Sequence, residues 1–291
     1  MRVLLRCRMR GKAGGLEKVI MLELKNLSFN VDGEGDGQDK EIIRNISLTV
    51  PDGKLVVITG PNGGGKSTLA KLIAGIEKPT SGRILLNGED ITDLSITDRA
   101  KKGIGFAFQQ PVRFKGIQVI DLLRLARGKH ISVADACDYL SAVGLCARDY
   151  IDREVNASLS GGELKRIEIA TVLARATTLS VFDEPEAGID LWSFQNLIEV
   201  FAGMRRRIRD SSIIIISHQE RILNIADEIV VIRDGEVLRQ GPKDEILPSL
   251  IGTASAVPDC LRSGAAHPVT ADGQFTAPVT ADAGAAAGSA E

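Results

Sequence analysis

The sequence predicts an α/β protein with a mostly parallel central sheet, an N-terminal antiparallel β subdomain and an inserted helical subdomain. Apolar, β-branched runs at residues 54–59, 179–182 and 213–216 are typical of strands buried on both faces of a parallel sheet. Alternating apolar residues between 22 and 50 favour an antiparallel start to the domain. Helical apolar spacing then recurs in residues 119–126, 133–143 and 163–174.

Further segments complete this order. A turn at 51–53 leads into the strand at 54–59, and Ser95 offers a helix start. Residues 104–111 read as a strand that ends in glutamine and proline. A helix over about 191–206 connects two buried strands and makes a parallel crossover unit. Additional strands are expected at residues 22–29, 42–50, 83–88, 228–232 and 236–239.

The composition and charge of the chain exclude several classes of function. With 291 residues, of which 44% are hydrophobic and 25% charged, the chain can bury one substantial core or two modest ones. A net charge of -2 gives no general field for binding nucleic acid. No apolar run approaches the length of a membrane span, so direct membrane insertion is not expected. The cysteines form no C-x-x-C pair, which argues against a zinc or iron-sulfur site and favours free thiols in the cytoplasm; they are Cys7, Cys137, Cys146 and Cys260.

The two ends of the chain differ from the middle. Residues 1–20 are basic without a clear apolar period, and we expect a poorly ordered extension, with Met21 a candidate for the natural start. Residues 21–251 form the predicted domain, and its helical subdomain covers about 112–175. Residues 252–291 are rich in Ala, Gly, Pro and Thr and bury too little to order themselves.

The clearest motif is the phosphate loop, residues 60–67, which has the form G-x-x-x-x-G-K-S between a strand and a helix at 68–74. Its glycines let backbone N–H groups surround a phosphate, and the helix N-terminus adds its positive dipole end. We expect Lys66 to reach the β- and γ-phosphates and Ser67 to bind Mg²⁺. The alternative is a glycine-rich turn with an incidental lysine. The predicted nucleotide-binding residues of this P-loop NTPase core are Gly60, Pro61, Asn62, Gly63, Gly64, Gly65, Lys66, Ser67 and Thr68.

Two adjacent carboxylates, Asp183 and Glu184, close a buried strand at the sheet edge where α/β proteins bind ligands. Asp183 suits Mg²⁺, directly or through water, and Glu184 suits a general base that activates water. Solvated acids at a strand end are the alternative.

A second anion site is predicted at the signature segment, residues 159–163, with the sequence L-S-G-G-E. Ser160 and Glu163 have the spacing of a capping box, which would start a helix whatever the function. The two readings are compatible, because a capped helix start with the bare Gly161 and Gly162 can also hold a γ-phosphate.

Three more residues follow predicted strands or acids. His218 comes after the four-isoleucine strand and is a candidate γ-phosphate contact. Gln109 is a candidate bridge between Mg²⁺ and the attacking water, and Asp190 lies in a turn after the acid pair. Ordinary polar loop residues are the alternative for each.

Together and in this order, these motifs make residues 21–251 resemble the ATP-binding cassette (ABC) ATPase family. The resemblance implies a Mg²⁺-dependent ATPase that converts ATP and water to ADP and phosphate. It also implies an ATP-dependent, head-to-tail homodimer in which Ser160 and Gly162 of one subunit cover ATP held by Lys66 of the other. Glu184 would catalyse, with His218 and Gln109 beside it.

Within the family, residues 108–116 and 218–223 are similar to the Suf-type iron-sulfur assembly ATPase. This likeness implies a soluble motor for a SufB/SufD-like scaffold protein. The alternative is the nucleotide-binding subunit of a membrane transporter, whose partners would be permease subunits. A nucleotide-binding scaffold without hydrolysis is disfavoured because Glu184 is present.

Overall fold

The computed structural model describes residues 20–31, 40–128, 131–156, 158–207 and 211–254. The described residues up to Ser249 belong to one compact unit, and those from Leu250 belong to a second. The described part of the second unit is the end of helix α9 (Lys243–Ala254). The predicted basic extension, apart from Ile20, and nearly all of the predicted tail lie outside the described residues.

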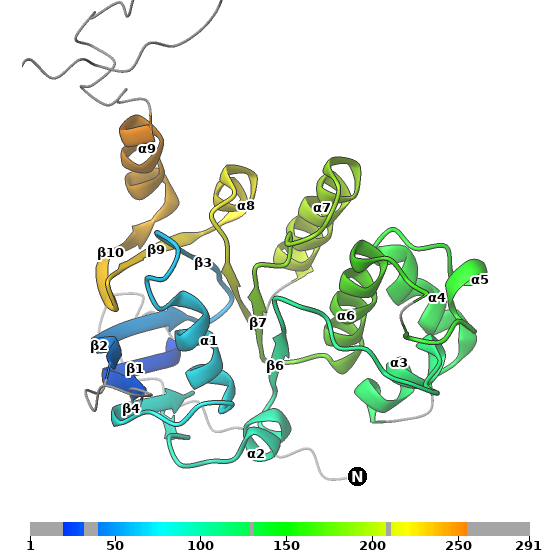
Figure 1. Ribbon diagram of the computed structural model, residues 1–291, viewed down its shortest axis with the longest axis horizontal. Coiled ribbons are helices and arrows are strands. Elements are labelled where there is room, and N and C mark those ends of the chain that lie inside the picture. Colours follow the sequence, from blue (N-terminus) through cyan, green and yellow to red (C-terminus); the bar gives the residue numbers. More distant parts are fainter. Residues whose placement is uncertain (1–19, 32–39, 129–130, 157, 208–210, 255–291) are drawn as a thin grey trace, which may run out of the picture. The chain divides into compact units, whose positions relative to one another are not determined.

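A six-stranded sheet forms the centre of the first unit (Figure 1). Its strand order is β10-β9-β3-β8-β7-β6, and every neighbouring pair is parallel except β10 and β9. All residues of β3, β7 and β8 are buried, as their unbroken apolar patterns predict. The strands are β3 (Leu55–Thr59), β6 (Ile104–Ala107), β7 (Leu179–Asp183), β8 (Ser212–Ile216), β9 (Glu228–Arg233) and β10 (Glu236–Pro242).

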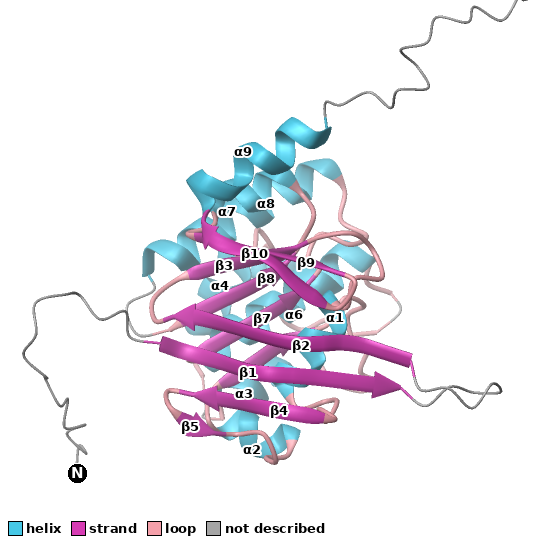
Figure 2. Ribbon diagram, turned by 90° about the vertical axis from the view of Figure 1, so that its left-hand side faces the viewer, coloured by secondary structure: helices cyan, strands magenta, loops and turns pink. Residues whose placement is uncertain are grey.

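A second, antiparallel sheet is built mainly from the N-terminal part of the domain, and Figure 2 shows its strands side by side. The strand order is β2-β1-β4-β5. Its strands are β1 (Ile20–Val31), β2 (Lys40–Pro51), β4 (Ser81–Leu86) and β5 (Glu89–Asp90). Leu24 of this sheet, Leu69 of helix α1 (Lys66–Ala74) and Ile214 of the parallel sheet belong to one buried cluster. Helix α1 therefore shares a core with both sheets.

The helices between β6 and β7 form the predicted inserted subdomain, which Figure 1 shows beside the edge of the parallel sheet. They are α3 (Val119–Arg127), α4 (Val133–Ala142), α5 (Ala147–Tyr150) and α6 (Gly161–Arg175). Helix α6 packs against both α3 and α4. The remaining helices of this unit are α2 (Ile96–Lys101), α7 (Leu191–Arg207) and α8 (Glu220–Ile225). The predicted fold class is thus confirmed.

The structure corrects one strand. The segment 104–111 was expected to be a strand ending in glutamine and proline, but β6 stops at Ala107. Beyond that residue the backbone of Phe108 bonds to side chains of α6 instead of to a neighbouring strand. A tertiary contact therefore ends the strand, and no local pattern announces it.

Four elements were not predicted, namely β5, α5, α8 and α9. The first three contain two to six residues, too few for a period to be visible. Helix α9 contains Pro248, a residue that sequence reasoning treats as a helix breaker. No helix in the described ranges has both the length and the apolar character needed to cross a lipid bilayer.

A buried arginine holds the C-terminal end of the phosphate-loop helix. Arg99 is 1% exposed, and its Nη1 donates to the carbonyls of Leu72 (2.5 Å) and Ile73 (3.0 Å). Its Nε and Nη2 donate to the carbonyls of Leu94 and Thr92. The last carbonyls of a helix lack partners within the helix, so this side chain supplies them.

We predict that Arg99→Met lowers the free energy of unfolding by about 2 to 4 kcal/mol, because charge-assisted hydrogen bonds are lost and buried carbonyls are left unpaired. Urea unfolding measures the loss. Lys101→Met is the control, since Lys101 lies on the same helix but its side chain is 73% exposed. Equal losses in the two variants would contradict the proposed capping by Arg99.

Candidate functional site

The carboxyl ends of three neighbouring parallel strands meet at one edge of the sheet. In the strand register Ile58 of β3 pairs with Ile216 of β8, and Ile216 pairs with Asp183 of β7. The chain leaves β3 into the phosphate loop, β7 into Glu184 and β8 into Ser217 and His218. Hydrogen bonds from Ser217 N–H to Ile58 (3.1 Å) and from Glu184 N–H to Ile216 (3.0 Å) keep these exits side by side. The predicted motifs after these strands therefore share one edge.

The phosphate loop lies close against strand β9 and leads into helix α1. Gly60 has φ +139°, and a Cβ there would lie 1.9 Å from the carbonyl oxygen of Ile232, so the loop and β9 approach too closely for a side chain. Helix α1 starts from Gly65 without a side-chain cap, so the cap residue supplies no acceptor for its first N–H groups, and a helix start of this kind can bind an anion.

The Lys66 amine is bound within this loop. Its Nζ donates to the carbonyls of Gly60 (2.9 Å) and Pro61 (2.8 Å), and the residue is 5% exposed. Burial lowers the pKa of Lys66, while the charges of Glu184 and Asp183 act in the opposite direction. A buried cation near two acids and a ring of amides suits a polyphosphate, whose charge compensates the lysine.

Ser67 and Asp183 lie in direct contact. The Ser67 hydroxyl donates to Asp183 Oδ1 over 3.0 Å, and Asp183 is 3% exposed. Burial raises the pKa of Asp183, although the Ser67 hydrogen bond lowers it in part. A hydroxyl beside a buried carboxylate is an oxygen donor set that fits Mg²⁺. No cluster of three or more His, Cys, Asp or Glu side chains arranged for a metal occurs among the described residues. The remaining ligands of such an ion would therefore be phosphate oxygens and water.

Glu184 contacts Gln109 across the edge of the sheet. Gln109 Nε2 donates to Glu184 Oε2 over 2.5 Å, joining residues 75 positions apart in sequence. Glu184 has φ +42°, a backbone conformation that costs a side-chain-bearing residue roughly 1 to 3 kcal/mol. A general base held in this way, beside an amide that can orient water, is an arrangement suited to attack on a phosphoryl group.

The loop after Glu184 is tied to the segment that carries His218. Ser217 is fully buried, and its hydroxyl donates to Glu186 Oε1 over 2.5 Å and accepts the N–H of Gln219 over 3.0 Å. Burial raises the pKa of the Glu186 carboxyl, and the His218 charge opposes this shift, so the two side chains are electrostatic neighbours. His218 itself is exposed at the surface.

The signature segment forms the capping box that its spacing predicts. Ser160 Oγ accepts the N–H of Glu163 over 3.2 Å, and Glu163 Oε2 accepts the N–H of Ser160 over 2.7 Å. The Tyr150 hydroxyl donates to the same carboxylate and lowers the pKa of Glu163. A Cβ built on Gly161 would come within 4.0 Å of the carbonyl oxygen of Gly188, so the start of α6 lies beside the loop that leads to Asp190.

Asp190 accepts hydrogen bonds from backbone N–H groups in the first turn of α7. Its Oδ1 accepts the N–H of Ser193 over 3.0 Å, and its carbonyl accepts the N–H of Phe194 over 2.9 Å. Six of the predicted site residues thus differ in what their side chains do. Direct side-chain hydrogen bonds join Ser67 to Asp183 and Gln109 to Glu184, whereas the side chains of Ser160 and Asp190 begin helices α6 and α7.

Sequence reasoning missed several polar residues at this edge. Lys165 and Glu168 of α6 bind the backbone of Phe108, and Glu186 binds Ser217. The available signal was a lysine and a glutamate three positions apart within an apolar helical period, a spacing that also describes an exposed ion pair. Burial distinguishes the two cases, and burial is not visible in one sequence.

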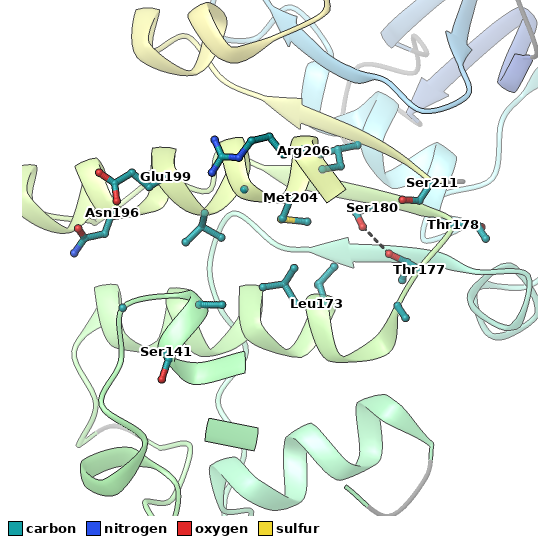
Figure 3. A pocket seen from close by; sticks show the side chains of 17 residues that line it. Ser141, Leu173, Thr177, Thr178, Ser180, Asn196, Glu199, Met204, Arg206 and Ser211 are labelled. Atoms are coloured by element: carbon teal, nitrogen blue, oxygen red, sulfur yellow. Dashed lines mark hydrogen bonds between the residues drawn. The ribbon is translucent and has the colours of Figure 1, made fainter. Parts of the chain in front are cut away.

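The structure also contains a pocket of about 860 Å³ that is separate from this edge (Figure 3). It lies between helices α6 and α7, lined by Leu173 on one side and by Glu199, Met204 and Arg206 on the other. Ser180 and Ser211 place it near the start of β7 and β8, away from the ends that carry Asp183 and Ser217. We therefore do not assign the nucleotide to this pocket.

Comparison with known proteins places the chain among ATP-binding cassettes. The family model described as ABC transporter matches residues 43–187. An uncharacterized ABC transporter ATP-binding protein of Methanocaldococcus jannaschii is 40% identical over 216 residues, which are 72% of this chain and 86% of that protein. The probable ATP-dependent transporter SufC of Escherichia coli is 33% identical over 238 residues, which are 76% of this chain and 92% of that protein.

Other relatives and a solved structure extend the comparison. The Fe(3+) ions import ATP-binding protein FbpC of Photobacterium profundum is 31% identical over 216 residues, which are 72% of this chain and 59% of that protein. A solved dimeric ATP-binding cassette in a post-hydrolysis state, bound to ADP and Pi, has a TM-score of 0.69 and 24% identity. The match covers 77% of this chain and 99% of that one, and it supports the fold.

The raised pKa of Glu186 gives a pH-dependent prediction. Because burial makes the folded state bind the proton of Glu186 more tightly than the unfolded state does, the stability contributed by the protonated carboxyl is lost as the pH rises through its folded pKa. Glu186→Gln cannot lose a proton and can still accept from Ser217. We predict that its stability advantage over the wild type grows from pH 4 to pH 8 in urea unfolding, and a pH-independent difference would contradict this.

Proposed function

Since the chain belongs to the ATP-binding cassette family of ATPases, we propose that it hydrolyses Mg²⁺-bound ATP between two copies of itself and uses the closing and opening of that dimer to drive a partner. The observation that carries the proposal is the joining of Ser67 to Asp183 and of Gln109 to Glu184 at one edge of the sheet. ATP is the proposed substrate at this edge.

Residues 60–68 hold the phosphates. The N–H groups at the start of α1, which has no side-chain cap, bind phosphate oxygens, and Lys66 exchanges the carbonyls of Gly60 and Pro61 for the β- and γ-phosphates. That exchange is favourable because a phosphate oxygen is charged and a carbonyl oxygen is not.

Ser67, Asp183 and Gln109 are the protein groups that would hold Mg²⁺. When bound, the ion neutralises charge on the β- and γ-phosphate oxygens. Burial raises the pKa of Asp183, and a nearby cation would stabilise the charged form of this carboxyl group.

Glu184 is the proposed general base. It accepts a proton from water as the water oxygen bonds to the γ-phosphorus, and the bond from that phosphorus to the bridging oxygen of ADP breaks. Gln109, which already reaches Glu184 Oε2, orients the water. His218 contacts the γ-phosphate from the end of β8.

The second subunit contributes the signature segment. Gly162 lies in the first turn of α6, its φ is not in the left-handed region, and a Cβ there would meet nothing within 4 Å. The isolated subunit therefore has no steric need for glycine at a helical position where alanine is the better helix former. Glycine is required at this position if a phosphate held by the other copy approaches the backbone closely. The Ser160 hydroxyl and the Gly161 and Gly162 amides would donate to that phosphate, with Asp190 in the neighbouring loop.

Two variants separate binding from hydrolysis. We predict that Lys66→Ala largely abolishes ATP binding, whereas Glu184→Gln binds ATP, loses at least about 100-fold in turnover and accumulates as a dimer in gel filtration with ATP. Binding is measured by equilibrium dialysis with labelled ATP, and turnover by phosphate release. Hydrolysis by Glu184→Gln at the wild-type rate would exclude Glu184 as the base.

The partner is the finer part of the proposal. The likeness of residues 108–116 and 218–223 to Suf-type ATPases, together with the 33% identity to SufC, supports a SufB/SufD-like iron-sulfur scaffold as the partner. Membrane permease subunits are the second candidate, supported by the relative named as an iron import ATP-binding protein. In either role we place the protein in the cytoplasm, which agrees with the free thiols of Cys137 and Cys146.

Purification from the native host decides between these partners. We predict that tagged Glu184→Gln, held in its dimer by ATP, recovers a SufB/SufD-like protein from the supernatant after the membranes have been sedimented. The matched control is Lys66→Ala, which does not form the ATP dimer and recovers less of a dimer-dependent partner. Recovery of permease subunits from the detergent-solubilised membrane fraction would replace the first candidate with the second.

A further inference from the structure

Two charged side chains of α6 grip the backbone of the Gln109 loop, residues 108–116. Lys165 is fully buried, and its Nζ donates to the carbonyls of Phe108 and Gln109 and lies 3.4 Å from Glu168 Oε2. Glu168 Oε1 accepts the N–H of Phe108 over 2.9 Å. An ammonium group has three protons to donate; two of them have a backbone carbonyl as acceptor here, and Glu168 Oε2 is an ion-pair partner. The peptide groups around Phe108 are thus held at both N–H and C=O by one helix.

This pair is an inefficient way to gain stability. Burial lowers the pKa of Lys165 and raises that of Glu168, because removing each charged group from water costs free energy. Replacing a buried ion pair by apolar side chains is often neutral or stabilising. What an apolar pair cannot do is fix the direction of a polar backbone, and the side chains of Lys165 and Glu168 do that over 57 and 60 positions of sequence.

The grip connects two parts of the proposed ATP site. Lys165 holds the Gln109 carbonyl, and the side chain of Gln109 reaches Glu184. Ser160, at the N-terminus of the same helix, is five residues before Lys165, which is about 7.5 Å along an α-helix. A shift of the signature segment therefore moves the backbone to which Gln109 belongs.

We propose that Lys165 and Glu168 are positioning residues, which clamp the Phe108 and Gln109 backbone to α6 so that Gln109 meets Glu184 only when the signature helix is in place. The inference rests on the proposed roles of Gln109 and Glu184 in ATP hydrolysis. In the proposed dimer, the signature helix of a subunit covers the nucleotide held by the other subunit. Through the clamp, the position of the same helix would also set the position of Gln109 beside the nucleotide that the subunit itself holds.

The test removes both charges together, so that neither remains buried and unpaired. The clamp variant is Lys165→Met with Glu168→Met, and the matched control is Lys102→Met with Glu89→Met. In the control pair Lys102 Nζ lies 2.6 Å from Glu89 Oε1 at the surface, where Glu89 is 63% exposed. Equal thermal unfolding of the clamp variant and wild type by circular dichroism shows that the clamp variant is folded.

The first readout is hydrogen exchange of the nucleotide-free protein. We expect the amide of Phe108, whose N–H Glu168 accepts, to exchange at least about tenfold faster in the clamp variant, with the amides of α1 unchanged. Unchanged exchange at Phe108 would overturn the clamp whatever the kinetics show. If the clamp variant does not fold, Glu168→Gln replaces it. That variant keeps the length of the side chain but weakens the acceptor for the Phe108 amide, so its exchange should still rise.

The second readout is the steady-state kinetics of ATP hydrolysis. We expect kcat to fall by about tenfold and KM for ATP to stay within about twofold, since a misplaced positioning group costs turnover more than binding. In the control variant neither should change. An equal loss of kcat in both variants would overturn the proposal.

A double-mutant cycle with Gln109→Ala decides whether the clamp acts through Gln109. If it does, Gln109→Ala lowers kcat in the wild type and changes it by less than about twofold in the clamp variant. Equal effects of Gln109→Ala in both backgrounds would overturn the proposal. If Gln109→Ala has no effect in the wild type, the positioning role falls with that of Gln109, while the tests of Lys66 and Glu184 still judge hydrolysis itself.

Discussion

The parallel alignment of β3, β8 and β7 is the constraint on which the site depends. Because the three strands run side by side in the same direction, the residues that follow them emerge at one level of the sheet. The Ser67 hydroxyl can then reach Asp183, which lies 116 positions away in the sequence. A slip of one residue between strands would turn Asp183 toward the opposite face and separate this pair.

Much of this organisation was predictable from the sequence, because its signals are local and strong. The apolar runs of the parallel strands, the glycine pattern of residues 60–67 and the S-x-x-E spacing at Ser160 each specify a structure within a few residues. What failed was the end of β6. The backbone of Phe108 leaves the strand because it bonds to two side chains of α6 that are 57 and 60 positions away. Those side chains are buried only once α6 has packed in the folded protein. Glu186 was missed for the same reason, since its partner Ser217 lies 31 positions away, just after strand β8.

The site combines a strained acid with glycines that its own subunit does not require. Glu184 has a positive φ, which the N–H bond to Ile216 helps to maintain. At Gly162 the subunit accepts the lower helix propensity of glycine and leaves open space above the backbone. Both features weaken a single copy of the chain. Both are accounted for if the working unit contains a nucleotide and a second copy.

The way Lys66 binds its own loop bears on how the reaction product leaves. This buried amine has partners within its own loop, because the carbonyls of Gly60 and Pro61 accept its protons. In the proposed cycle the same two carbonyls would accept the protons of Lys66 again when the phosphate leaves, so the amine would not be left buried without a partner. If Lys66 holds phosphate as proposed, each binding event breaks two hydrogen bonds that the loop makes to its own lysine, and their loss offsets part of the attraction between the amine and the phosphate.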